Sequence, residues 1–410
     1  MSKTIWYISK YFAPETDDSP GSRGWLLMKE FVKQGYKPVV ITSDSNNLVS
    51  LPKLNASVTL EENQGVTLIW LRTMKYKVAK SARRILSWVH FEWNLFWLNK
   101  GLFTKPDVII VSSLSLLSIL NGLILKKKYG CRLVFEIRDI WPLTIVEEGG
   151  FSPRNPFVLI LGVIERLGYR YSDLIVGTMP NLGEHVKEIL GYERNVKCIP
   201  MGLDVTKLQD DVIVPSDYVD KYFDSRKFNV VHAGTVGITN ALETFFKAAE
   251  LMKDFDDVRF VIVGDGALKN HYIDIYGHLP NLIFAPKVSK NMVQSVLAHS
   301  DLLYFSVYKS KVWEYGQSLN KVIDYMLSDK PIVASYSGYP SMINEAGCGT
   351  YVPAEDAASL VNEIKRYCSM SVEDRSQIGA KGKAWLLENR SYKKLASEYI
   401  SILFNKEIEC

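Results

Sequence analysis

The sequence predicts an α/β protein made of two doubly wound domains in tandem. The chain has 410 residues, 47% of them apolar, so each half can bury its own core. Short apolar runs rich in β-branched residues alternate with helical patterns, which is typical of parallel sheets covered by helices on both faces. A polar, irregular stretch from about Asp204 to Lys227 separates two series of these runs. We therefore expect one domain over residues 1–203 and a second over residues 204–389.

The apolar runs are the expected strands. In the first series they are Thr4–Ser9, Pro38–Thr42, Val66–Leu71, Val108–Val111, Leu133–Ile137, Leu174–Val176 and Val196–Ile199. In the second series they are Asn229–His232, Arg259–Val263, Leu282–Phe284, Leu302–Phe305 and Ile332–Ala334. Ligands of such sheets bind beyond the carboxyl ends of the strands, so the loops there decide the function.

The stretch Val108–Leu125 carries no charge and approaches the length of a membrane-spanning helix. We predict a buried strand and then a helix instead, because several serines interrupt the stretch and Lys126–Lys128 suit a helix C-terminus. Ile5–Ser9 is too short for a signal-peptide core and is closed by Lys10, so no targeting signal is expected.

Composition excludes several classes of protein. The net charge of +4 argues against a general nucleic-acid binder. The five scattered cysteines form no CxxC pair, which argues against a disulfide framework or a zinc site and fits a reducing cytosol. Asp254–Asp256 matches an Asp-x-Asp manganese pattern, but it precedes a strand, at the end away from the ligand loops. We interpret it as a solvated turn and His232 as a packed histidine, and we expect no metal site.

Two glycine-bearing loops follow strands of the second series. Val261–Gly266 runs from a strand into a Gly-x-Gly turn, with a helix expected from about Ala267. It lacks the third glycine of a dinucleotide fingerprint, so it is either a tight turn or a ligand loop. Asn229–Gly237 ends in a similar loop, with a helix beginning near Asn240. Such loops let backbone amides approach an anionic ligand.

The segment Trp313–Met326 carries the most information. A Gly-x-Ser turn at Gly316–Ser318 opens a helix, whose free N–H groups and positive dipole end suit a diphosphate. Lys321 lies in the first turn, where acidic residues are preferred, and a nearby ligand phosphate would explain it. Asp324, one turn further on, could hydrogen-bond a ribose diol.

Taken together, the loops resemble those of the retaining GT-B glycosyltransferases of family 4, over nearly the whole chain. In the second half, the resemblance rests on the Gly234 loop, Val263–Gly266, Gly316–Met326 and Lys330–Ser335. In the first half, it rests on Tyr11–Glu15, Gly21–Arg23, Phe135–Pro142 and Ile199–Asp204. Phe135–Pro142 resembles the hallmark loop of the branch that assembles bacterial O-antigen and capsule sugars, which includes the N-acetyl-L-fucosamine transferases.

This resemblance implies two Rossmann-like domains facing a cleft, with a helix over residues 390–410 that crosses back to the first domain. It implies that the first domain binds the acceptor and the second the nucleotide sugar. The implied reaction moves a sugar, an N-acetylated or deoxy hexosamine, from a UDP-sugar to a polyprenyl-diphosphate-linked acceptor without a metal or other cofactor. The implied location is cytoplasmic, on the inner face of the plasma membrane.

The expected site residues follow from the loops and the resemblance. The expected catalytic residues are Lys321, with the helix amides, for the leaving diphosphate, and Arg138 and Asp139 to position the sugars. The expected donor-binding residues are Gly21, Ser22, Arg23, Gly234, Thr235, Gly264, Gly266, Lys287, Val288, Ser318, Leu319, Asn320, Lys321 and Asp324.

The chain departs from the family at the donor site. Of two family glutamates eight positions apart, the second falls at Asp324 and the first at Gly316, where Glu314 could substitute. Two family cations are Thr235 and Asn240 here, so the charge falls on Lys321 and Arg23. Two other functions therefore remain open: a sugar-nucleotide 2-epimerase of the same fold, and a two-lobed binding protein without catalysis.

The segment Lys75–Lys105 suggests a membrane contact. Its cations Lys75, Lys77, Lys80, Arg83 and Arg84 precede the aromatic residues Trp88, Phe91, Trp93, Phe96 and Trp97. Cations followed by an aromatic helix suit an anionic membrane surface. The alternative is an amphipathic helix that packs its rings on the sheet, and both can hold on different faces of the helix.

Overall fold

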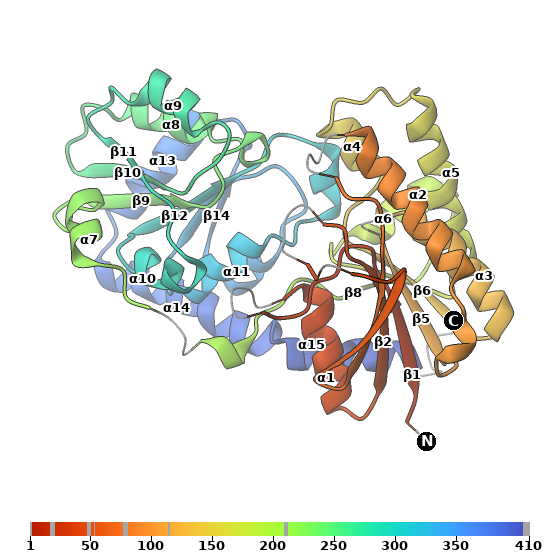
Figure 1. The fold of residues 1–410 in the computed structure, drawn as a ribbon. Coiled ribbons are helices and arrows are strands. Elements are labelled where there is room, and N and C mark those ends of the chain that lie inside the picture. Colours follow the sequence, from red (N-terminus) through yellow and green to blue (C-terminus); the bar gives the residue numbers. More distant parts are fainter. Residues whose placement is uncertain are drawn as a thin grey trace. The chain divides into compact units, whose positions relative to one another are not determined.

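The computed structural model describes residues 2–16, 21–46, 51–52, 54–76, 81–113, 115–208 and 212–404. The chain divides into two compact units (Figure 1). Unit 1 comprises Met1–Pro200 and Tyr392–Cys410, and unit 2 comprises Met201–Ser391. The predicted boundaries, after residue 203 and before residue 390, lie close to these limits.

Unit 1 contains a sheet of eight strands within the described ranges, in the order β3-β4-β2-β1-β5-β6-β7-β8. The strands are β1 Thr4–Ile8, β2 Lys37–Ser43, β3 Val58–Asn63, β4 Val66–Leu71, β5 Val108–Ser112, β6 Arg132–Ile137, β7 Leu174–Gly177 and β8 Val196–Cys198. Neighbouring strands are parallel except β3, which runs antiparallel to β4 at the edge. The chain order reverses between β1 and β5, and the loops after these two strands flank the crevice where such sheets bind ligands.

The helices of unit 1 cover both faces of this sheet. They are α1 Arg23–Lys33, α2 Ala82–Trp97, η1 Lys100–Leu102, α3 Ser118–Tyr129, α4 Leu143–Glu147, α5 Pro156–Tyr171, α6 Leu182–Leu190 and α15 Tyr392–Phe404. Helix α15 packs against α1, while α3 contacts both α2 and α5 (Figure 1). None of the helices in the described part of the chain has the length and apolar composition needed to cross a bilayer. The stretch Val108–Leu125 accordingly divides between β5 and α3.

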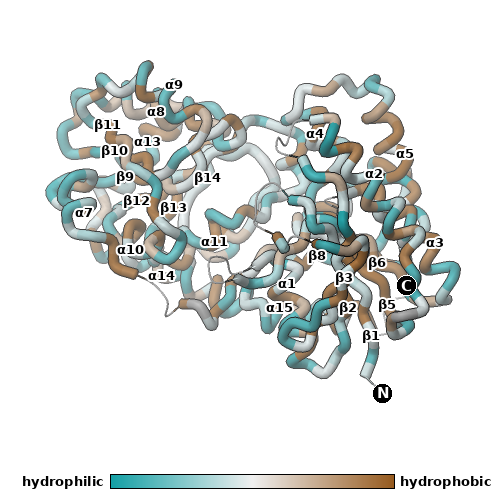
Figure 2. Tube along the Cα trace, in the orientation of Figure 1, coloured by the Kyte–Doolittle hydropathy of each residue, from teal (hydrophilic) through white to brown (hydrophobic). Residues whose placement is uncertain are grey.

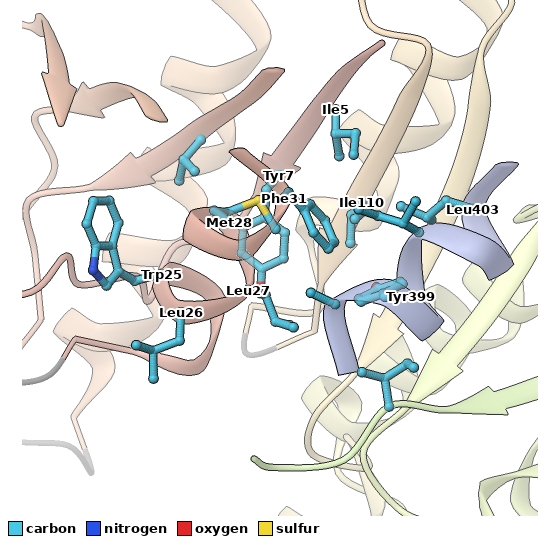
Figure 3. Close-up of a cluster of buried hydrophobic side chains, with 14 of the residues drawn as sticks. Ile5, Tyr7, Trp25, Leu26, Leu27, Met28, Phe31, Ile110, Tyr399 and Leu403 are labelled. Carbon is cyan, nitrogen blue, oxygen red and sulfur yellow. The ribbon is translucent and has the colours of Figure 1, made fainter. Parts of the chain in front are cut away.

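The core of unit 1 lies between the sheet and the pair α1–α15 (Figure 3). Phe31 of α1 and Tyr399 of α15 meet edge to face, with ring centroids 5.9 Å apart. Leu395 and Leu403 are also buried, and Phe404 stacks on Tyr36. The apolar stripe of the last helix therefore completes the first core, which confirms the predicted return of the chain end.

A buried ion pair lies at the centre of unit 1. The guanidinium of Arg23, in α1, donates to Glu136 of β6 over 2.7 Å, and both side chains are shielded from solvent. Arg23 also donates to the carbonyls of Ile199 and Pro200, where the chain leaves the unit. Burial opposes ionisation of Glu136, but the charge and hydrogen bond of Arg23 hold the pKa of its carboxyl below the usual range.

Two tyrosines complete the same network. Tyr7 of β1 donates to Glu136 over 2.8 Å, and Tyr399 of α15 donates to Glu136 over 3.3 Å. Burial and the nearby carboxylate raise the pKa of both phenols, which stay protonated and act as donors. One carboxylate thus connects a helix, two strands and the C-terminal helix.

Unit 2 contains a sheet of six parallel strands in its described part, in the order β11-β10-β9-β12-β13-β14. The strands are β9 Phe228–Ala233, β10 Val258–Val263, β11 Leu282–Ala285, β12 Leu302–Ser306, β13 Ile332–Ser335 and β14 Gly349–Val352. The chain order reverses between β9 and β12, which places the ligand crevice beyond the ends of these two strands.

Helices also surround the second sheet. They are η2 Val205–Lys207, α7 Ser216–Tyr222, η3 Ile238–Asn240, α8 Glu243–Leu251, α9 Lys269–Tyr276, η4 Lys290–Met292, α10 Val293–Leu297, η5 Lys311–Tyr315, α11 Asn320–Leu327, α12 Met342–Ala346, α13 Ala357–Cys368 and α14 Val372–Asn389. The helices expected from Ala267 and near Asn240 begin later, at α9 and α8, because a turn or a short 3₁₀ helix comes first.

Each predicted strand forms, and two further strands escaped prediction. Strand β3 is an antiparallel edge strand that alternates partly buried and exposed residues and ends in Glu61–Asn63, so it lacks an apolar run. Strand β14 begins at Gly349 and is four residues long, too short to show a period. Both lie at sheet edges, where burial on two faces is not required.

Breaking the buried ion pair should destabilise unit 1. In Arg23→Met, the carboxylate of Glu136 loses its cation in a dry interior, and we expect the free energy of unfolding to fall by about 3–5 kcal/mol. The double variant Arg23→Met, Glu136→Gln should recover a large part of this loss, because no uncompensated charge remains. Urea denaturation followed by circular dichroism measures both. Equal losses in the two proteins would contradict the central role of the ion pair.

Candidate active site

The donor residues predicted in the second half meet at the crevice of unit 2. Strand β9 ends at Ala233 and leads into the loop that contains Gly234 and Thr235, and η3 follows. Ser306, the last residue of β12, donates its hydroxyl to the carbonyl of Asn240 over 2.7 Å. This bond joins the end of β12 to η3, the element that follows β9.

Lys321 extends from the first turn of α11 into this crevice. Its ammonium donates to the side-chain oxygen of Asn240 and lies 4.0 Å from the position of a Cβ on Gly234. Burial lowers the pKa of Lys321 to about 8. The resemblance implies a lysine at the position of Asn240, and the ammonium of Lys321 places a positive charge beside that position.

His232 lies directly beneath the same loop. It is fully buried, and its Nδ1 lies 3.2 Å from the carbonyl of Tyr304. Burial, together with the charge of Lys321, lowers the pKa of His232 to about 3, so the ring is neutral at physiological pH. A neutral, enclosed imidazole fits the predicted packed histidine rather than a general base.

The glycines of the two loops have a packing role. A Cβ on Gly264 would lie 1.8 Å from the carbonyl oxygen of Gly234, and a Cβ on Gly266 would lie 2.2 Å from that of Val236. The loops after β9 and β10 are further joined by a hydrogen bond from the amide of Val236 to the carbonyl of Asp265. The Gly-x-Gly turn therefore lets two backbones touch, and this packing alone explains its glycines.

The N-terminus of α11 is held by its own loop. The Ser318 hydroxyl accepts from the amide of Met201 over 2.9 Å, and Gln317 accepts from the amide of Leu319. Leu319 is the N-cap residue, and its side chain supplies no cap to the helix. Asn320, the first helical residue, is exposed. The turn thus fixes the direction of the helix N-terminus, while its hydroxyl is used within the unit.

Asp324 and the loop after β11 lie together. Lys290 of η4 pairs with the carboxylate of Asp324 over 2.5 Å. Lys287 is exposed and Val288 is half-buried in the same loop. Sequence reasoning missed Lys290, which is the cation next to the expected ribose ligand.

The expected donor residues of unit 1 are explained by the fold itself. A Cβ on Gly21 would lie 2.6 Å from the ring of Trp25, and Gly21 has a left-handed φ of 82°. Ser22 caps α1 by accepting from the amide of Trp25. Arg23 is engaged with Glu136 and two carbonyls, as described above, so its position needs no ligand phosphate.

Arg138 and Asp139 follow β6 at the crevice of unit 1. The hydroxyl of Ser113, just after β5, accepts from the amide of Arg138 and donates to the carbonyl of Asp139. Asp139 is exposed as a residue, but the surrounding protein desolvates its carboxyl group, which raises the pKa of that group above the usual range. The Nε of Arg138 is buried without a hydrogen-bond partner among the described residues. The two bonds to Ser113 hold the backbone of this loop in place, and the Nε–H of Arg138 remains available as a donor.

A cluster of rings around Arg84 lies near this loop, and sequence reasoning missed it. The hydroxyl of Tyr11 accepts from the indole of Trp88 over 2.7 Å and from Arg84 over 3.2 Å. The guanidinium carbon of Arg84 is 5.3 Å from the Trp88 ring centroid and 6.0 Å from that of Trp141. Beside them, burial and the charge of Arg84 lower the pKa of Lys10 to about 7.

This cluster changes the predicted membrane patch. Of its five cations, Lys77 and Lys80 lie outside the described residues. Lys75 pairs with Asp44, and Arg84 stacks on aromatic rings, whereas Arg83 is exposed.

Within the described ranges, no group of acidic, histidine or cysteine side chains has the arrangement of a metal site.

Comparison with known proteins gives this geometry a context. Residues 227–370, within unit 2, match the family model described as Glycosyl transferases group 1. The chain is a glycosyltransferase. It transfers a sugar from a nucleotide sugar, and the loops of unit 2 that the sequence predicts to bind the donor lie within the matched region. No curated protein sequence matches the glycosyltransferase significantly.

Solved structures show that the fold is GT-B. A sucrose-phosphate synthase from Thermosynechococcus elongatus has a TM-score of 0.71 and 14% identity, with 98% of each chain covered. An E. coli trehalose-6-phosphate protein bound with UDP-2-fluoro glucose has a TM-score of 0.73 and 12% identity, with 99% of this chain and 100% of that chain covered. Anabaena HepE, solved with UDP and glucose, has a TM-score of 0.63 and 15% identity, with 97% and 98% covered.

The close approach of the two loops in the glycosyltransferase can be tested at a single methyl group. Gly266→Ala should lower the free energy of unfolding of unit 2 by about 1–3 kcal/mol, because the new Cβ meets the carbonyl of Val236. Gly237→Ala is the matched control: its Cβ would find no atom nearer than 3.6 Å, so a change within about 0.5 kcal/mol is expected. Thermal or urea unfolding compares them, and equal effects would refute the packing role.

Proposed function

We propose that the enzyme is a retaining glycosyltransferase of bacterial surface polysaccharide synthesis, of the O-antigen or capsule type. It would move an N-acetylated or deoxy hexosamine from a UDP-sugar to a polyprenyl-diphosphate-linked acceptor at the inner face of the plasma membrane. The observation that carries the donor part is the ammonium of the half-buried Lys321, which donates to the side chain of Asn240 beyond β9 in unit 2. Complexes of Anabaena HepE with UDP and with UDP-glucose support the choice of uridine nucleotide.

The chemistry requires stabilisation of the leaving group. As the bond from the sugar C1 to the UDP oxygen breaks, the diphosphate gains negative charge. The ammonium of Lys321 and the backbone amides at the start of α11 would stabilise that negative charge. The acceptor hydroxyl oxygen then bonds to C1, and its proton passes to a donor phosphate oxygen. No protein base is needed, which agrees with the neutral, enclosed ring of His232.

The acceptor would bind to unit 1, at the crevice beyond β1 and β5. Arg138 offers an unused buried Nε–H there, and Asp139 offers a carboxyl group whose pKa is raised by burial. We therefore assign Arg138 and Asp139 to the positioning of the acceptor, and Asp324, held by Lys290, to the ribose of the donor.

The pKa of Lys321 gives the donor site a pH signature. With a folded-state pKa of about 8, the free enzyme loses this charge as the pH rises above 8, and UDP must then restore the proton on binding. Affinity for UDP should therefore be flat near pH 7 and weaken above pH 8, by up to about tenfold per unit. Lys321→Arg stays charged and should not show this decline, whereas Lys321→Ala should bind about 1.5–3 kcal/mol more weakly at pH 7.

Isothermal titration calorimetry with UDP across this pH range measures these effects. The conservative change Lys253→Arg, at an exposed lysine before β10 and outside the proposed site, is the matched control and should keep the wild-type profile. The placement of the diphosphate would be wrong if Lys321→Ala bound UDP as tightly as the wild type.

Turnover distinguishes the proposed function from the alternatives. UDP should be released from a UDP-sugar only when a lipid-linked saccharide acceptor is present, and the rate should survive excess EDTA. An epimerase would convert the UDP-sugar without acceptor, and a binding protein would release nothing. Loss of turnover in EDTA that manganese restores would show that metal ligands exist in the chain.

A further inference from the structure

The outer side of α2 exposes an apolar stripe. Leu86 and Val89 are each 52% exposed, and Trp93, Phe96 and Trp97 are 63%, 48% and 66% exposed. The inner side of the same helix packs Trp88, Phe91 and Leu95 into unit 1. The helix therefore packs one set of rings inside, as the alternative interpretation predicts, and leaves another set facing solvent on the opposite side.

The apolar stripe continues onto the neighbouring helices. On α5, Leu159, Ile160 and Val163 are 57%, 58% and 61% exposed, and on α3, Leu120 and Ile124 are 37% and 50% exposed. Helix α3 contacts both α2 and α5, and Figure 1 draws the three helices on the same side of unit 1. Brown segments mark α2 and α5 in Figure 2. We call these ten residues the apolar face.

The charges beside the apolar face have one sign. The strongly exposed charged residues of α2, α3 and α5 are Arg83, Lys127, Lys128, Arg166 and Arg170. The structure describes all three helices completely, and the acidic residues among them are Glu92 and Glu165. The half-buried Lys126 of α3 pairs with Asp173 and is not counted in this surface charge.

Both acidic residues serve the interior. Glu92 accepts from Ser118 over 2.5 Å and from Asn121 over 2.7 Å, so it fastens α2 to α3. Glu165 is 1% exposed and lies 2.7 Å from His185 of α6. Burial raises the pKa of both carboxyls. The surface of the three helices is therefore apolar and cationic, with its carboxyl groups turned inward.

We propose that the apolar face, with its flanking cations, docks unit 1 on an anionic lipid surface by inserting its side chains among the headgroups. Exposed tryptophans favour this depth, because the ring is apolar and the indole N–H remains hydrated. A second copy of the chain fits less well, since a two-fold contact through this face would oppose like charges. The proposal rests on the proposed function and deepens it: the surface brings the enzyme to a lipid-linked acceptor.

The driving force differs from that predicted for Lys75–Arg84. The prediction combined the cations of that patch with the aromatic residues of the helix. Lys75 and Arg84 are engaged with Asp44 and with Tyr11, so we place the contact on the apolar face instead. Inserted apolar side chains keep their contribution in high salt, whereas attraction between exposed charges is screened. The docking should therefore weaken only in part when salt is added.

Co-sedimentation of the full chain with vesicles tests the surface. The vesicles are phosphatidylcholine alone, or phosphatidylcholine with phosphatidylglycerol. The wild type should bind the anionic vesicles and retain part of this binding at about 1 M salt, where the screening length is about 3 Å. Two variants remove the insertion, Trp93→Gln, Phe96→Gln, Trp97→Gln on α2 and Leu159→Gln, Ile160→Gln, Val163→Gln on α5. Each should lower the partition coefficient by about tenfold or more.

A matched control replaces exposed apolar residues elsewhere. Ile213→Gln, Leu251→Gln, Val372→Gln removes three side chains that are 84%, 64% and 67% exposed in unit 2, and it should bind vesicles as the wild type does. Circular dichroism and UDP binding should stay unchanged in all three variants, since the altered side chains are exposed.

Three results would overturn the proposal. In the first, both insertion variants fold and still sediment with vesicles as the wild type does. In the second, the wild type does not bind vesicles. In the third, the wild type is a dimer in size-exclusion chromatography and the insertion variants are monomers. Failure of the proposed transferase reaction is a separate result, because UDP release is measured independently of sedimentation. If UDP release fails but vesicle binding depends on the apolar face, the docking surface is supported and the proposed reaction is not.

Discussion

The buried pair of Arg23 and Glu136 is the contact on which unit 1 depends. Two opposite charges in a dry interior need each other, because either alone would carry a large desolvation cost. Tyr7 and Tyr399 donate to the same carboxylate, so β1, β6, α1 and α15 converge on one group. The remaining donors of Arg23 hold the carbonyls of Ile199 and Pro200, where the chain leaves the unit. The end of the chain is thus fixed to the unit that contains its beginning.

Unit 2 uses backbone proximity instead of a buried ion pair. The loops after β9 and β10 touch at Gly264 and Gly266, and Lys269 of α9 donates to the carbonyls of Gly264 and Ala285. These contacts give Gly234 and Thr235 a fixed path at the crevice. Lys321 enters from the other side on α11. Desolvation lowers the pKa of Lys321, because its ammonium is partly removed from water without an anion beside it among the described residues. A donor diphosphate would supply that anion.

The two faces of α2 show how one helix can serve both stability and location. Trp88 turns inward, where its indole is satisfied by Tyr11, while Trp93 and Trp97 turn outward. The single carboxylate of this helix, that of Glu92, accepts hydrogen bonds from Ser118 and Asn121 of α3. The proposed lipid-linked acceptor would suit such a division, because the helix that packs Trp88 against unit 1 would also present its outer side chains to the bilayer.

The sequence by itself determined the fold class, because strands buried on both faces must be apolar throughout, as in Val108–Val111 and Phe260–Val263. It also indicated which loops are candidates for the donor site, since glycines after strands and a lysine in the first turn of a helix can be recognised from the sequence alone. The edge strands β3 and β14 could not be predicted, because an edge needs little apolar sequence.

Only the tertiary structure decided what each side chain contacts. Arg23 and Lys321 are both cations of loops that were expected to bind phosphate. Arg23 forms an ion pair with Glu136, whereas Lys321 donates to the side chain of Asn240. Arg84 and Arg83 are neighbours in the chain, and a helical turn of about 100° per residue places one against rings and the other in solvent. Spacing gives the face of a helix, but the partner on that face comes from a distant part of the chain.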